Sequence, residues 1–250
     1  MNKAPRLWVL DSFRGMAVLM MIGFHLTFDL ATFGEMGIRR TFTLPLWYWK
    51  SVPNLIGGLF FSIVGISAVL RFQSQSNPSY RPFLKRGLQI FAIGMGITAL
   101  TSFMRSNGVI YFGTLHGIGA SLLLVYPFLR YSYANLLLSI FIIAGGILLE
   151  GYRFDTPLFL WLGFIPTTGG GPDCFPLIPW FGVVLLGVFL GQQFTKMSVA
   201  KVPTQSIMPV LVPPVRGLSW IGKHALWIYL LHQPLMLGLL YIAGLVWFQI

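Results

Sequence analysis

The sequence predicts an all-α membrane protein: a polytopic bundle of about seven spanning helices in a single domain over residues 1–250. Of the 250 residues, 56% are hydrophobic and 9% are charged, whereas soluble domains carry about 25% charged residues. The mean hydropathy is +0.76, and apolar stretches near the roughly 20 residues of a spanning helix recur along the chain. No charged block is long enough to form a separate soluble domain.

Seven apolar stretches are long enough to be predicted as spans. A shorter run, Leu158–Ile165, is too brief to cross a membrane and allows an eighth element, a half-helix or an interfacial segment. The connection 196–222 contains four prolines, so it cannot be helical throughout. The predicted spans are Trp8–Leu30, Pro53–Leu70, Gly87–Phe103, Tyr111–Leu129, Ala134–Leu149, Pro179–Phe194 and His224–Phe248.

Charges in the connections predict the orientation. The net charge is +11, and a cytoplasmic N-terminus with seven spans puts eleven of the 17 Lys and Arg residues on the inner side. Positive charge concentrates on the cytoplasmic side of membrane proteins, so we expect the N-terminus inside and the C-terminus outside. We attribute the positive charge first to membrane topology and second to binding of anionic lipid or an anionic substrate. Nucleic acid is therefore not an expected partner. The inner set is Lys3, Arg6, Arg71, Arg81, Lys85, Arg86, Arg130, Lys196, Lys201, Arg216 and Lys223, and the outer set is Arg39, Arg40, Lys50, Arg105 and Arg153.

Glycines recur at close-approach spacing in two predicted helices. Gly113 with Gly117, and Gly187 with Gly191, would let helix backbones pack closely where lipid offers no hydrophobic driving force. A further glycine-rich run lies at 167–173, but it lacks the lysine and the following hydroxyl of a phosphate-binding P-loop. We therefore interpret it as a flexible or lid-like loop.

Four ionisable side chains interrupt the first predicted helix. At 100° per residue, Asp29 returns to the azimuth of Asp11, and His25 and Arg14 lie about 40° and 60° to one side. Ionisable residues at membrane depth face a bundle interior or a wet cavity and indicate a functional site. This stripe is the candidate catalytic site.

Each residue of the stripe has an expected role. A carboxylate one turn beyond a histidine can orient its ring, so Asp29 is expected to hold His25 as a general base. Arg14 is a permanent cation that needs an anionic partner, either Asp11 or a substrate phosphate. The structural alternative is that Asp11 and Arg14, three residues apart, form an ion pair that only stabilises the helix.

Other histidines and the single cysteine give weaker signals. His116 and His232 fall inside predicted spans, where a histidine is either a substrate-binding group or a hydrogen-bonded packing residue. His224 is placed at an inner helix end, where a cation suits the interface. No two histidines have the four-residue spacing of a helical metal site, so we expect no metal. Cys174 stands alone, which excludes an intramolecular disulfide.

At these residues the chain resembles a known family. Its opening helix looks like that of membrane acyltransferases related to heparan-α-glucosaminide N-acetyltransferase, and the spacing of Arg14 and His25 also resembles the acyltransferase-3 family. Further similar segments follow in the same order, so the resemblance covers nearly the whole chain. The segments are Leu10–Ala17 with His25, Tyr111–His116, Asp173–Gly182 and Ile221–Pro234.

The resemblance implies transfer of an acyl group, typically acetyl from cytoplasmic acetyl-CoA, to a sugar amine or hydroxyl across the membrane. Arg14 and His25 match the acyltransferase-3 pair. The lysosomal enzyme carries asparagine at the position of His25 and its proposed catalytic histidine in the following loop, but loop 31–52 of this chain contains no histidine. A covalent acyl-histidine and direct transfer both remain open.

The remaining binding residues follow from charge and position. Arg86 and Lys223, with Arg81 and Lys85, are expected to meet the CoA phosphates at the basic inner face. Asp11 is expected to pair with Arg14, and His116, Asp173 or His232 to contact the acceptor. The expected partners are therefore acyl-CoA, a glycan or amino-sugar acceptor and membrane lipids, with a homodimer also open, in a bacterial inner membrane.

Two other functions compete with acyl transfer. A transporter or flippase of a polar or lipid-linked solute would also use an ionisable site at the midplane, although the sequence shows no inverted repeat. A membrane scaffold could use the glycine pairs as its interface, but it leaves His25 and Asp29 without a purpose. Binding of acyl-CoA distinguishes the enzyme from a carrier.

Overall fold

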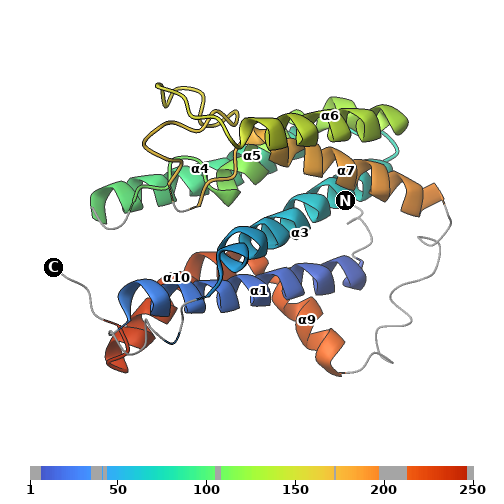
Figure 1. Cartoon of the computed structure of the whole chain (residues 1–250). Helices are drawn as coiled ribbons and strands as arrows, with labels where there is room; N and C mark the ends of the chain where they lie inside the picture. The colour runs from blue at the N-terminus through green and yellow to red at the C-terminus, as the bar shows by residue number, and fades with distance from the viewer. Residues whose placement is uncertain are drawn as a thin grey trace. The chain divides into compact units, whose positions relative to one another are not determined.

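The computed structural model describes residues 7–34, 41, 44–104, 108–171, 173–196 and 213–246 (Figure 1). Lys3, Arg6, Arg39, Arg40, Arg105 and Lys201, which the orientation prediction uses, lie outside these residues, as does the end of the last predicted span, 247–248. Within them the secondary structure is helical, with only two isolated β-bridges. The helices are α1 (Trp8–Phe33), α3 (Leu46–Gln73), α4 (Arg81–Met104), α5 (Thr114–Leu124), the 3₁₀-helix η1 (Tyr126–Arg130), α6 (Tyr133–Leu149), α7 (Leu177–Lys196), α9 (Pro213–Lys223) and α10 (Ala225–Ile242).

The described residues fall into two compact units. Unit 1 comprises 61–104, 108–171 and 173–196, and unit 2 comprises 7–34, 41, 44–60 and 213–246. Helix α3 contributes its first part to unit 2 and its second part to unit 1. The single domain expected from the sequence stays a prediction.

The predicted fold class, a helical membrane bundle, is confirmed. In the described parts of the chain, α1, α3, α4, α7 and α10 are long and apolar enough to cross a membrane. The other two predicted spans correspond to shorter apolar helices, α5 with 11 residues and α6 with 17. At 1.5 Å per residue, α5 is about 16 Å long, roughly half the hydrocarbon thickness of a bilayer.

The predicted span Tyr111–Leu129 is wrong as a single helix. Helix α5 ends at Leu124, and η1 continues the chain from Tyr126. Pro127 has no N–H to donate to the carbonyl of Leu123, so the α-helical hydrogen bonding stops there. The hydroxyl of Tyr80 donates to that carbonyl instead, at 3.0 Å. The end of α5 is therefore stabilised by its contact with Tyr80, which directly precedes α4.

Glycines bring α7 against α3 inside unit 1. A Cβ on Gly187 would overlap the backbone oxygen of Ser62, and one on Gly65 would overlap the backbone oxygen of Val184. A Cβ on Gly191 would lie 3.1 Å from the Cα of Ile66. The packing role predicted for Gly187 and Gly191 is confirmed, and Gly65 is its counterpart on α3.

Positive charge gathers at one end of unit 1. The ring of Tyr126 contacts those of Phe72, Tyr80 and Phe83, which brings the end of α3, the start of α4 and η1 together. Gln192 near the end of α7 donates to the carbonyl of Leu129 at 2.8 Å. The exposed cations at this end are Arg71, Arg81, Lys85, Arg86, Arg130 and Lys196. Their gathering matches the predicted cytoplasmic side, and the orientation itself stays a prediction.

The run Leu158–Ile165 forms consecutive turns rather than a half-helix. Backbone hydrogen bonds link Leu162 and Phe164 back to the carbonyl of Phe159. Gly163 has φ +130°, a conformation outside the helical region that favours glycine. The turns then bind the start of α7, because Ile178 donates its N–H to the carbonyl of Leu162 at 2.9 Å.

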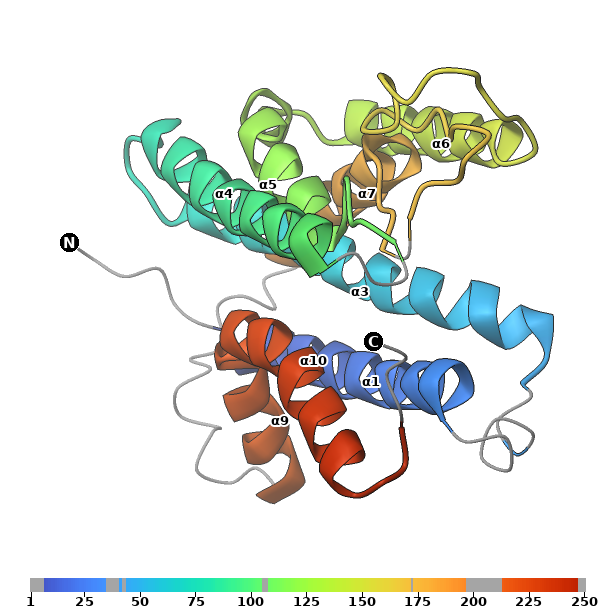
Figure 2. The same cartoon turned by 90° about the vertical axis from the view of Figure 1, so that its left-hand side faces the viewer.

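Unit 2 is built around α1, which α9 and α10 both contact (Figure 1, Figure 2). Val18 and Met21 of α1, Ile56 of α3 and Ala225 of α10 form its buried apolar core. Helix α9 falls in the proline-containing connection and begins at Pro213, where a missing N–H costs no helical hydrogen bond. The sequence did not indicate this helix or its contact with α1.

Candidate active site

His25 of α1 meets His232 of α10 inside unit 2. The ring nitrogen Nδ1 of His25 lies 3.4 Å from Nε2 of His232, and the ring centroids are 4.9 Å apart at 66°. Nδ1 of His25 also lies 3.0 Å from the carbonyl oxygen of Met21, and Nδ1 of His232 lies 2.7 Å from that of Tyr229. Both rings are half-buried. Two residues that the sequence singled out separately therefore form one pair.

Asp29 lies one turn beyond His25 and is fully buried, with 0% of its surface exposed. Its carboxylate accepts hydrogen bonds from Nε2 of Gln233 at both oxygens, at 2.9 and 3.1 Å. The expected partner of this carboxylate was the ring of His25, and the structure gives it Gln233. Sequence reasoning missed Gln233, although its place directly after His232 was a usable signal.

The two contacts fix how α1 and α10 align. Neighbours on α10, His232 and Gln233, bind residues one turn apart on α1, His25 and Asp29. A one-residue slip of either helix would break both contacts and leave the buried carboxylate without its amide donor. Leaving a buried polar group unsatisfied costs about 1–3 kcal/mol, and more for a charged group.

We expect Gln233→Leu to lower the free energy of unfolding by about 2 kcal/mol, because it strips the donor from a buried carboxylate. The double variant Asp29→Leu with Gln233→Leu should lose less than the sum of the two single variants, because it removes both polar partners together. Unfolding of the detergent-solubilised protein, followed by tryptophan fluorescence, measures all three. Strictly additive losses would contradict the coupling of this pair.

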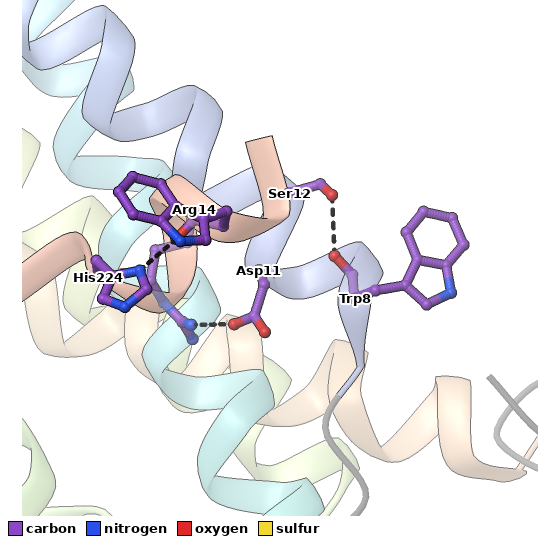
Figure 3. Close-up of polar contacts among 6 residues, drawn as sticks. Trp8, Asp11, Ser12, Arg14 and His224 are labelled. Atoms are coloured by element: carbon purple, nitrogen blue, oxygen red, sulfur yellow. Dashed lines mark hydrogen bonds and ion pairs between the residues drawn. The ribbon is translucent and has the colours of Figure 1, made fainter. Parts of the chain in front are cut away.

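Asp11 and Arg14 form an ion pair near the start of α1 (Figure 3). Nη1 of Arg14 donates to Oδ1 of Asp11 at 2.7 Å, with Asp11 buried and the Arg14 side chain 26% exposed. In the same region, His224 contacts the carbonyl oxygen of Trp220 through Nδ1, at 2.9 Å. The pair agrees with the structural alternative, and the exposed part of Arg14 leaves the expected phosphate contact as a prediction.

The close contact of α9 places the backbone of Lys223 near the same end of α1. Lys223 follows Gly222, whose Cα carries no Cβ and lies against the backbone of Asp11. Arg14 and Lys223 thus place two cations at this end of α1. His25 lies eleven residues beyond Arg14, about 16 Å along the helix axis. The cations and the histidine pair therefore lie at different positions along α1.

His116 in unit 1 is held by local structure. It is buried, its Nδ1 accepts the backbone N–H of Gly113 at 3.1 Å, and its Nε2 lies 3.3 Å from Oγ1 of Thr98. Its ring contacts those of Phe91 and Phe112. Nδ1 thus binds the start of α5 and Nε2 contacts α4, which agrees with the packing alternative, and contact with an acceptor stays a prediction.

Asp173 also serves the start of α5. Its carboxylate accepts the backbone N–H of Thr114 at 3.1 Å and the hydroxyl of Thr114 at 2.9 Å. A carboxylate at a helix N-terminus satisfies an unpaired N–H and interacts favourably with the helix dipole. Gly113 permits this approach, because a Cβ there would overlap Oδ2 of Asp173. The predicted contact of Asp173 with substrate is untested by these bonds.

The Cys174 thiol is not reactive, and no cluster of metal-binding side chains is found among the described residues. Burial, and then the charge of Asp173, raise the pKa of the Cys174 thiol to about 12, so it is protonated at neutral pH and is a poor nucleophile. In the described ranges no three His, Cys, Asp or Glu side chains gather as a metal ion would require.

The predicted residues divide between the two units. Unit 2 holds the pair His25 and His232 and the ion pair of Arg14 with Asp11, together with Asp29 and Lys223. Unit 1 holds the other three, His116 and Asp173 at the start of α5 and the exposed Arg86 at the basic end. The histidine pair of unit 2 is accordingly the best candidate for chemistry.

The fold and the histidine pair define the class: an integral membrane protein of helices that carries ionisable residues within its spans, where such residues mark functional sites. The model of the heparan-alpha-glucosaminide N-acetyltransferase catalytic family matches residues 6–234. The chain therefore belongs to this family, and the predicted resemblance is confirmed. Comparison with curated proteins and with solved structures gives no match.

Membership in the family implies an acyltransferase, and its description specifies N-acetyl transfer to a sugar amine. The matched range includes His25, Asp29, His232 and Gln233, so the whole candidate site lies inside it. The relation to the acyltransferase-3 family rests on the spacing of Arg14 and His25 alone and stays a resemblance.

Proposed function

We propose that this protein transfers an acetyl group from cytoplasmic acetyl-CoA to the amine of an amino sugar on the other side of the membrane. The observation that carries the proposal is the contact of His25 with His232 at 3.4 Å, inside the part of the chain that matches the family. An imidazole titrates near neutral pH, which suits a general base for an amine.

His25 acts as the base in this mechanism. The amine of the sugar attacks the thioester carbonyl carbon, and the ring of His25 takes the proton that the nitrogen loses. The carbon–sulfur bond then breaks, and the proton passes from His25 to the CoA thiolate. The products are an N-acetylated sugar and CoA with a free thiol, so atoms and charge balance.

The cationic end of α1 supports binding of the donor. Arg14 and Lys223 in unit 2 are suited to phosphate oxygens, and Asp11 holds the guanidinium of Arg14 in place at 2.7 Å. The contact of Arg86, in unit 1, with the CoA phosphates stays a prediction from the sequence. The acyl end would extend along α1 from Arg14 towards His25, about 16 Å away along the helix.

The decisive experiment gives the purified full chain, in liposomes, acetyl-CoA with a radioactive acetyl group and glucosamine. We expect N-acetylglucosamine and free CoA in equal amounts, identified by mass spectrometry and a thiol assay. Glucosamine uptake without acetyl-CoA binding would overturn the proposal in favour of a transporter. Acetylation of hydroxyls alone, with the amine unchanged, would overturn the choice of amine.

A further inference from the structure

Protons on the histidine pair can be assigned from its backbone contacts. A carbonyl oxygen only accepts hydrogen bonds, so a ring nitrogen within 3.0 Å of one carries a hydrogen. Nδ1 of His25 has the carbonyl of Met21 at 3.0 Å, and Nδ1 of His232 has that of Tyr229 at 2.7 Å. Both rings therefore hold a hydrogen on Nδ1.

Nδ1 of His25 carries one hydrogen, so its two neighbours share it. The carbonyl oxygen of Met21 accepts at 3.0 Å, and Nε2 of His232, 3.4 Å away, accepts with its lone pair. Protonating Nε2 of His232 would set two N–H groups against each other, so the contact requires a neutral His232. In the neutral form of His25, the lone pair then lies on Nε2.

We propose that His232 is a positioning residue for His25: together with the carbonyl of Met21 it accepts Nδ1–H and so keeps on Nε2 of His25 the lone pair that receives the substrate proton. The proposal rests on the proposed role of His25 as the base. In Ser-His-Asp triads a buried carboxylate accepts this hydrogen, holds the tautomer and stabilises the imidazolium. Here Asp29 is bound by Gln233, and Nε2 of His232 shares the accepting position with the carbonyl oxygen of Met21.

The same contact strengthens during the reaction. When Nε2 of His25 takes the amine proton, the ring becomes an imidazolium, and its Nδ1–H bond to His232 becomes charge-assisted. The positive charge is thus stabilised by a neutral imidazole inside the bundle. After the proton passes from Nε2 to the CoA thiolate, both rings return to their starting forms.

Nitrogen NMR of the full chain in detergent, with ¹⁵N-labelled histidine, tests the assignment without any substrate. The resonances of His25 are identified by their absence from the spectrum of His25→Gln. We expect a protonated Nδ1 and a lone-pair Nε2 for neutral His25, and a shifted Nδ1 resonance in His232→Leu. His224→Gln removes a histidine that contacts only its own turn among the described residues and should leave the His25 resonances unchanged.

Kinetics of the same variants provide a second readout. His232→Leu should lower kcat about 100-fold with KM changed less than twofold, and His232→Gln, whose amide oxygen can accept the hydrogen, should recover most of the rate. A protonated Nε2 in resting His25, or His25 resonances unaffected by His232→Leu, would overturn the proposal. Shifted resonances in a chain that transfers no acetyl group would support the pair and refute the proposed function instead.

Discussion

His25→Ala is expected to lower the rate of acetyl transfer about 1,000-fold, because general base catalysis by a positioned side chain contributes roughly 10²–10⁴. The ring is half-buried between α1 and α10, and its contacts with Met21 and His232 hold it in one orientation. Water, which is not held in one orientation, is a poor replacement for such a base. The measurement is the formation of N-acetylglucosamine by each purified chain at saturating acetyl-CoA.

Two controls accompany this substitution. His224→Gln should keep the full rate, since His224 contacts the carbonyl of its own helical turn at Trp220. His25→Asn should be as impaired as His25→Ala, because loop 31–52 contains no histidine that could act as the base. Full activity of folded His25→Ala protein would show that the base lies elsewhere.

The sequence predicts the membrane bundle well because hydropathy and length are local properties. Tyr111–Leu129 illustrates where it fails: the run is apolar throughout, but the tertiary bond from Tyr80 to the carbonyl of Leu123 allows the helix to break before Pro127. Helix α9 is a different case. The four prolines of connection 196–222 exclude a helix throughout, but the two in α9 stand at its start, where they are compatible with a helix.

The sequence predicts only the part of the site that lies on α1. Helical periodicity indicates that Asp11, Arg14, His25 and Asp29 share a stripe, since that follows from 100° per residue. It does not say which residues of α10 face the stripe, because the alignment of two helices depends on packing along their whole contact. A shift of one residue would have presented other side chains to His25 and Asp29 in place of His232 and Gln233.

Packing of α9 on α1 depends on Gly222. A Cβ there would overlap the backbone oxygen of Asp11 and lie 3.0 Å from its Cα, so even alanine forces the two backbones apart. Gly15 faces α9 in the same way, since its Cβ would overlap the carbonyl oxygen of Leu218. Overpacking a tight contact costs typically 1–3 kcal/mol, and a clash with backbone cannot be relieved by a rotamer change.

We therefore expect Gly222→Ala to lower the free energy of unfolding by about 3 kcal/mol and to weaken donor binding, because the separation also moves Lys223 away from the Asp11–Arg14 pair. Gly217→Ala is the matched control: it lies on the same helix, is exposed, and a Cβ there meets nothing within 4 Å. Both changes alter helix propensity equally, and Gly217→Ala should stabilise by up to about 1 kcal/mol. Thermal unfolding in one detergent compares them, and equal unfolding temperatures for the two variants would show that α9 does not depend on this close contact.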